Sequence, residues 1–194
     1  MTLVGFKSMT VRVLDNQEQA TVGTNIFAFE GKENKGATQK VDIKGLSPEV
    51  TKVYGSNIAY YVSRKGVGNV EADFEILDLR MQVAEILLGY KKSGALGFIG
   101  SDTEAPYCSV LLESEEPDGT PVYVALFKGS FSKEELGAET LKEKTEELGS
   151  DKLKFTALPG DTGDAAGQYL GYYIGRDEQE VTKLKQLLKM VTAG

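Results

Sequence analysis

The stretch Val70-Glu71-Ala72-Asp73-Phe74-Glu75-Ile76 decides the fold, because apolar and acidic residues alternate along it without interruption. Successive side chains of a β-strand point to opposite faces, so the pattern predicts one face against a core and three carboxylates on the other face. The turn at residues 64–68 precedes it, and the apolar residues of 58–62 precede the turn. We therefore expect this strand to be half of a hairpin.

A helix is expected directly after this strand, because apolar residues recur there at helical spacing: Leu79, Val83, Ile86, Leu87 and Tyr90. Asp78 is the expected N-terminal cap, and Gly89 or Gly94 is the expected stop. A second amphipathic helix is predicted at the C-terminus, with an apolar face made by Val181, Leu184, Leu187, Leu188 and Val191.

Strand patterns dominate the rest of the chain, at residues 6–14, 41–45, 106–113, 122–131 and 153–158. The turn at 116–120 predicts that 106–113 and 122–131 form a core hairpin, with Cys108 as a buried small apolar residue. Residues 139–148 fit either a helix or an exposed strand, and we favour a strand that pairs with 153–158. Glycines make the stretch from 160 to 175 irregular. The fold class is therefore mainly β, with one helix in mid-chain and one at the end.

Composition excludes several classes of function. The chain of 194 residues has a formal net charge of -7, which argues against a nucleic-acid binder, and no apolar run approaches the length of a spanning helix. It has no histidine and one cysteine, so a serine or cysteine hydrolase with a histidine base is excluded. Asp161-Thr162-Gly163 spells the tripeptide of aspartic peptidases, but its surroundings have loop composition. Gly94 to Gly100 is interpreted as a flexible connection rather than a phosphate loop.

The segment from Asp15 to Lys40 is unusually long and polar for a connection inside a compact domain. Its one apolar patch contains Ile26, Phe27 and Phe29, and an exposed apolar patch in a long loop usually marks an interface. We therefore expect this patch to contact another molecule.

The order of several segments resembles the major tail proteins, or tail tube proteins, of siphophages of Gram-positive bacteria, a group often called the phi13-type family. The segments that carry the resemblance are Val53-Tyr54-Gly55-Ser56-Asn57, Gly66-Val67-Gly68, Leu87-Leu88-Gly89-Tyr90, Ala105-Pro106-Tyr107, residues 122–131 and residues 153–159. The likeness covers residues 1–160, which we take as a tail tube domain that includes the polar loop 15–40. Residues 161–194, a Gly-rich segment and the terminal helix, resemble nothing that we can place.

The resemblance implies two packed antiparallel sheets, a β-sandwich or barrel, with one flanking helix and a C-terminal helix. It implies a structural virion protein without enzyme activity, cofactor or metal, made in the host cytoplasm and located in the virion tail. Six subunits would form a ring, and stacked rings would enclose a bore through which DNA passes without specific binding. The implied partners are other copies of the chain, the tape measure protein, and the tail terminator and baseplate proteins.

Two surfaces follow from this reading. Ile26, Phe27 and Phe29 are the predicted anchors between rings. Glu71, Asp73 and Glu75 must lie either in the bore or on the exterior, and we favour the bore, where repulsion by the carboxylates would keep DNA from adhering.

Three rival readings stay open: a tube subunit of a contractile tail or injection device, a peptidase that uses Asp161, and a monomeric ligand-binding β-sandwich such as an adhesin.

Overall fold

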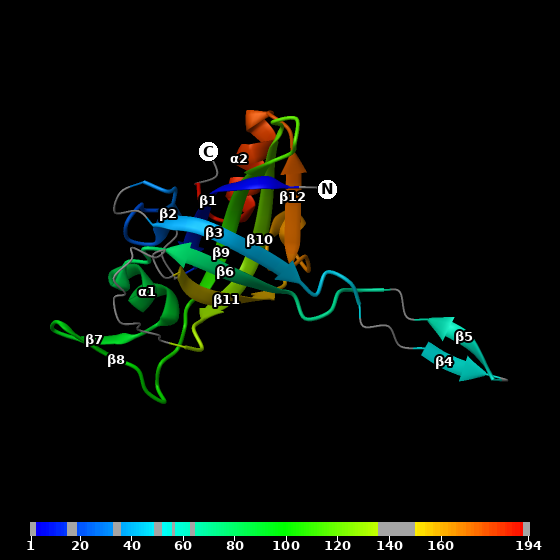
Figure 1. Ribbon diagram of the computed structural model, residues 1–194, viewed down its shortest axis with the longest axis horizontal. Helices are drawn as coiled ribbons and strands as arrows, with labels where there is room; N and C mark the ends of the chain where they lie inside the picture. The colour runs from blue at the N-terminus through cyan, green and yellow to red at the C-terminus, as the bar shows by residue number, and fades with distance from the viewer. Residues whose placement is uncertain are drawn as a thin grey trace, which may run out of the picture.

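A computed structural model describes residues 3–14, 19–32, 36–48, 52–55, 57–62, 65–135 and 150–191. Strands predominate in it (Figure 1). The strands are β1 (Val4–Val13), β2 (Ile26–Phe29), β3 (Ala37–Lys44), β4 (Lys52–Gly55), β5 (Ile58–Val62), β6 (Glu71–Leu77), β7 (Lys91–Ser93), β8 (Leu96–Phe98), β9 (Tyr107–Glu115), β10 (Pro121–Ser132), β11 (Ser150–Leu158) and β12 (Leu170–Ile174). The helices are α1 (Met81–Leu88), α2 (Glu178–Leu187) and a single 3-10 turn, Gly163–Ala165.

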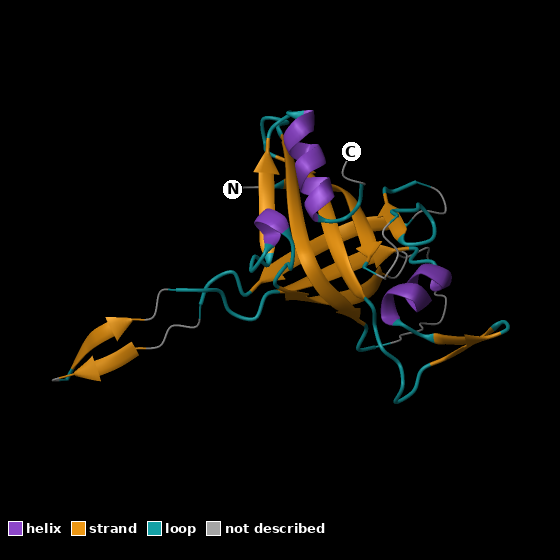
Figure 2. Cartoon of the chain, turned by 180° about the vertical axis from the view of Figure 1, so that it is seen from behind, coloured by secondary structure: helices purple, strands orange, loops and turns teal. Residues whose placement is uncertain are grey.

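One antiparallel sheet with the order β2-β1-β9-β10-β11-β6-β3 forms the body of the molecule. β10 joins its two halves, because residues 122–126 pair with β12 while residues 128–132 pair with β11 on the same edge. The sheet curls so far that β1 and β3 come into contact, and Figure 2 shows the strands of the two halves crossing. We call β2-β1-β9-β10-β12 the first half-sheet and β10-β11-β6-β3 the second half-sheet.

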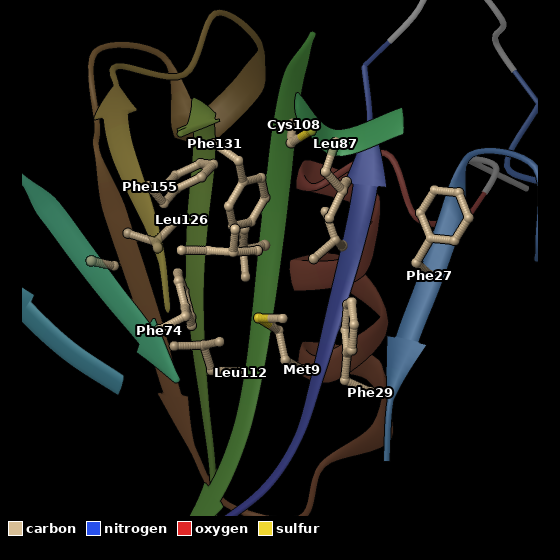
Figure 3. Close-up of a cluster of buried hydrophobic side chains, with 14 of the residues drawn as sticks. Met9, Phe27, Phe29, Phe74, Leu87, Cys108, Leu112, Leu126, Phe131 and Phe155 are labelled. Carbon is tan, nitrogen blue, oxygen red and sulfur yellow. The ribbon is translucent and has the colours of Figure 1, made fainter. Parts of the chain in front are cut away.

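The main core lies between these halves, as Figure 3 shows. The Phe131 ring lies 4.9 Å from Phe155 and 5.9 Å from Phe74, centroid to centroid, and all three side chains are buried. Such aromatic contacts add to the roughly 1.5–3 kcal/mol that burial of each large apolar side chain contributes. α1 closes one end of this core with Val83 and Leu87.

A second cluster lies on the outer face of the first half-sheet. Residues 124–127 of β10 are buried on both faces of the sheet, and Phe127 belongs to this outer cluster. α2 covers the cluster with Leu184 and Leu188, and the buried Ser109 hydroxyl donates a 2.7 Å hydrogen bond to the Leu188 carbonyl. Thus α2 covers this cluster on the outer face.

The predicted class, mainly β with a flanking and a terminal helix, is confirmed, although within the described residues the two layers are halves of one continuous sheet. Gly89 does end α1, with φ 69° in the left-handed region. Asp78 does not begin it. Asp78 has φ 53° and forms the turn out of β6, and Arg80 occupies the N-cap without a side-chain hydrogen bond.

The predicted hairpin between residues 58–62 and β6 is wrong. β5 pairs with β4, whereas β6 pairs with β3 on one edge and β11 on the other. The segment 139–148, predicted to pair with 153–158, lies outside the described residues, and the neighbours of β11 in the sheet are β10 and β6. The core hairpin of β9 and β10 is confirmed.

Several strands were not predicted, among them β2 and β4. The Gly-rich connection after α1 contains the hairpin β7–β8, and the irregular stretch after residue 160 contains β12, which pairs with β10. β12 and α2 therefore pack on the same sheet as the N-terminal part of the chain, while the division of the chain at residue 160 stays a prediction.

Candidate assembly surfaces

The outer face of the second half-sheet carries the three predicted carboxylates. In β6, Ala72, Phe74 and Ile76 are buried, and Glu71, Asp73 and Glu75 are half-buried on the opposite face. The alternation in the sequence therefore assigned the two faces correctly. Unlike the outer face of the first half-sheet, this one is open along β6, because neither of the two described α-helices packs on it (Figure 2).

Lysines from both neighbouring strands stand beside these carboxylates. The register places Lys44 opposite Glu71 and Lys40 opposite Glu75 from β3, and Lys154 opposite Asp73 and Lys152 opposite Glu75 from β11. Asp42 of β3 lies opposite Asp73. On these strand positions four carboxylates therefore share the face with four lysines.

Several charges on this face form ion pairs. The Lys44 ammonium lies 2.6 Å from Asp73, and Lys40 lies 2.6 Å from Asp42. The hydrogen bond from Lys44 holds the pKa of Asp73 below its ordinary value. This corrects the expectation of a purely acidic surface: we call the face formed by these eight residues of β3, β6 and β11 the charged ladder, and on these strand positions positive and negative charges are equal in number.

The predicted interface patch is not exposed. Ile26, Phe27 and Phe29 form part of β2, and their side chains are only 8%, 6% and 3% exposed. β2 pairs with β1, so Phe27 and Phe29 pack into the main core and Ile26 into the cluster under α2. In this structure these three residues hold the segment to the sheet, and they are not available as anchors for another ring.

The hairpin β4–β5 is separate from the main sheet. Its strands pair with each other, and Figure 1 shows it drawn out beyond the loops that end β3 and begin β6. Ile58, near its turn, is 63% exposed. We call β4–β5 the arm, and its shape suits contact with a second molecule.

The second hairpin, β7–β8, lies beside α1 on the opposite side of the molecule from the arm (Figures 1 and 2). Every residue from 91 to 100 is exposed, including Leu96, Phe98 and Ile99. Sequence reasoning missed this surface because the glycines suggested a flexible connection. The signal it overlooked is the alternation of Leu96 and Phe98 around Gly97.

The peptidase reading gains no support from the surroundings of Asp161. Its carboxylate is exposed and lies 3.2 Å from Lys128 and 3.8 Å from Lys189. The hydrogen bond from Lys128 lowers the pKa of Asp161, which is opposite to the raised pKa that one member of a shared-proton pair of aspartates needs.

Cys108 is buried, and burial raises the pKa of its thiol to about 12.

Among the described residues, no group of histidine, cysteine, aspartate or glutamate side chains is arranged to hold a metal ion. None of the described helices has the length and apolar character to cross a bilayer.

A family model described as phage tail tube protein matches residues 1–194, the whole chain. No curated protein matches it.

Proposed function

The chain belongs to the phage tail tube protein family, and we propose that it polymerises as stacked hexameric rings whose bore conducts DNA during ejection. The coarser statement, a structural protein of the virion tail, follows from the family itself. The observation that carries the proposal is the family match over the whole chain. The fold adds a curled sheet with one open face and one face covered by α2.

The covered face supports one proposed orientation of the subunit in the tube. α2 packs on the outer face of the first half-sheet, and a helix there would obstruct a bore. The open face of the second half-sheet can line a continuous wall, because its strands present charged side chains with ion pairs among them and neither described α-helix packs on it. Glu71, Asp73 and Glu75 therefore remain our proposed lumen-facing residues, with the exterior as the alternative.

The lysines of the charged ladder change the explanation of why DNA would pass through the bore without binding. A carboxylate beside each lysine competes with the DNA phosphates for that lysine, and Lys44 and Asp73 illustrate this arrangement. A wall with balanced, paired charges neither attracts a duplex strongly nor repels it over the roughly 8 Å of a Debye length in physiological salt. We propose that this neutrality, rather than repulsion by carboxylates alone, keeps the bore from binding DNA.

Other copies of the chain are the principal partner. A ring closed by head-to-tail contacts is heterologous, so each subunit offers two different surfaces. The arm is a candidate for one of them, because its two strands pair only with each other among the strands that the structure describes. Segment 15–40 remains a proposed contact between rings, but through its exposed residues rather than through Ile26, Phe27 and Phe29.

The tape measure protein, tail terminator and baseplate proteins are the further proposed partners, and the host cytoplasm is the proposed place of assembly. A non-enzymatic role fits the family and the setting of Asp161. The contractile-tail or injection-device alternative shares this fold and chemistry.

A map of tubes formed from the purified protein tests ring number and orientation together. We expect hexameric rings with Glu71, Asp73 and Glu75 towards the bore. A map that places these three carboxylates on the exterior would refute the orientation, and sedimentation that shows only the 21.0 kDa monomer under all conditions would refute polymerisation.

A charge-reversal pair of variants tests the bore in virions. Glu71→Lys, Asp73→Lys and Glu75→Lys together change the face by six charges per subunit, from three negative to three positive at these sites. The matched control makes the same change at the exposed Asp164, Glu178 and Glu180, near and on α2. We expect both variants to assemble and the first alone to slow DNA ejection; equal ejection rates would contradict the assignment.

A further inference from the structure

The two faces of the hairpin β7–β8 are chemically different. Its register pairs Lys92 with Gly97, and places Leu96 opposite Ser93 and Phe98 opposite Lys91. Lys92 forms an ion pair with Glu85 of α1, and a Cβ atom built on Gly97 would lie 3.3 Å from the Glu85 carboxylate. The Lys92 and Gly97 face is therefore turned to α1.

Because side chains alternate along a strand, Leu96 and Phe98 point away from α1. They are 64% and 52% exposed, and Ile99, directly after the strand, is 67% exposed. We call these three residues the hairpin patch. Within the described part of the chain β7 and β8 pair only with each other, and a lone two-stranded hairpin is marginally stable in water. An apolar face on such a hairpin is stabilised when a partner covers it.

The charges around the patch are already neutralised. Lys91 forms an ion pair with Asp102, as Lys92 does with Glu85. The whole chain has a formal net charge of -7, so two copies repel each other over most of their surfaces. At a locally neutral, apolar patch, two like-charged copies can approach each other without this electrostatic repulsion.

We infer that the hairpin patch is an assembly surface on which a second copy of this chain docks. The inference rests on the proposed function, since a tube subunit contacts copies of itself on several sides. Figures 1 and 2 place β7–β8 and the arm on opposite sides of the molecule, which suits a head-to-tail contact between different surfaces of neighbouring copies. Leu96 and Phe98 are the anchors of this contact.

A single labelled position tests this inference on the purified chain. Cys108 is buried and its thiol has a raised pKa, so Ser93→Cys, at an exposed position opposite Leu96, supplies the one readily labelled thiol for a spin label. In a preparation that holds only this protein, loss of access of a paramagnetic relaxation reagent to position 93 on assembly can come only from another copy. The unassembled protein is the reference, and we expect accessibility to fall about fivefold or more on burial.

A substitution pair measures how much the patch contributes. Leu96→Thr with Phe98→Thr removes the apolar surface and retains strand propensity, so the hairpin is preserved. We expect the association constant to fall about tenfold or more. The matched control is Val191→Thr, an exposed apolar residue after α2, which should assemble like the wild type. Circular dichroism checks that all variants are folded.

The outcomes separate this inference from the proposed function. Assembly of the labelled protein with position 93 still accessible, or normal assembly of the variant with Leu96→Thr and Phe98→Thr, would overturn the inference and leave the tube proposal intact. That result would mean that the patch serves another tail protein or none. A wild type that never assembles would overturn both.

Discussion

Replacing Leu188 by alanine should make α2 detach from the sheet at least about 30-fold more often. The Leu188 side chain is fully buried against the outer face of the first half-sheet. The substitution removes three carbon atoms, which costs about 2.4 kcal/mol at roughly 0.8 kcal/mol per buried methylene, and the residual cavity raises the expected range to about 2–5 kcal/mol. The lower end of that range, about 2 kcal/mol, corresponds to about 30-fold in the opening equilibrium.

Hydrogen exchange of the amides in α2 measures this opening directly. Because α2 is the last described element, it can open while the sheet remains folded, so amides of β10 should exchange as in the wild type. The control is Val191→Ala, three residues further on and 38% exposed, which should change exchange by less than about threefold. If Leu188→Ala and Val191→Ala behave alike, the packing of α2 on the sheet does not have the role assigned to it.

Three further predictions concern single groups. Gly89→Ala should lower the urea midpoint, because the new methyl would lie 1.9 Å from a backbone oxygen at φ 69°; Gly94→Ala, at φ 63° in open space, is the control for dihedral strain alone. The lowered pKa of Asp73 means that its ion pair stabilises the fold above the ordinary carboxyl value of 3.8 and is lost as pH falls through the lower folded value. In an NMR titration, Lys44→Gln should raise that pKa, and an unchanged value would contradict the pairing. Cys108, with its pKa raised to about 12 by burial, should react with a thiol reagent far faster in denaturant than in the native protein, and equal rates would show that it is accessible.

The sequence predicts one part of the candidate bore surface, its three carboxylates, but not the lysines beside them. Alternation along residues 70–76 places Glu71, Asp73 and Glu75 on one face of a strand, because that relation depends on the strand period alone. The lysines that neutralise them belong to β3 and β11, about 30 residues before and 80 residues after β6, and their register follows from pairing across the sheet. No local pattern predicts that Lys44 meets Asp73.

The apolar patch at residues 26–29 shows why exposure could not be predicted. The sequence shows Phe27 and Phe29 in a polar surrounding, which is equally consistent with a binding loop and with a short edge strand. The pairing of β2 with β1 decides between them, since it carries both rings into the core. The hairpin patch shows the opposite case, an exposed apolar surface that the sequence analysis missed, because the glycines around it were interpreted as a flexible connection. In the structure, Gly97 allows β8 to lie close to Glu85.

The sequence by itself determined the local structure of this protein: its strand-rich class, the two faces of β6, the end of α1 at one of two glycines, Gly89 or Gly94, and the absence of histidine-based chemistry. These depend on residue type and on spacing within one element. The tertiary structure alone decided which strands pair, which face α2 covers, and which charges neutralise one another. Those relations join residues far apart in the chain, and they follow from how one curled sheet buries the most apolar surface while every β-strand finds a neighbour.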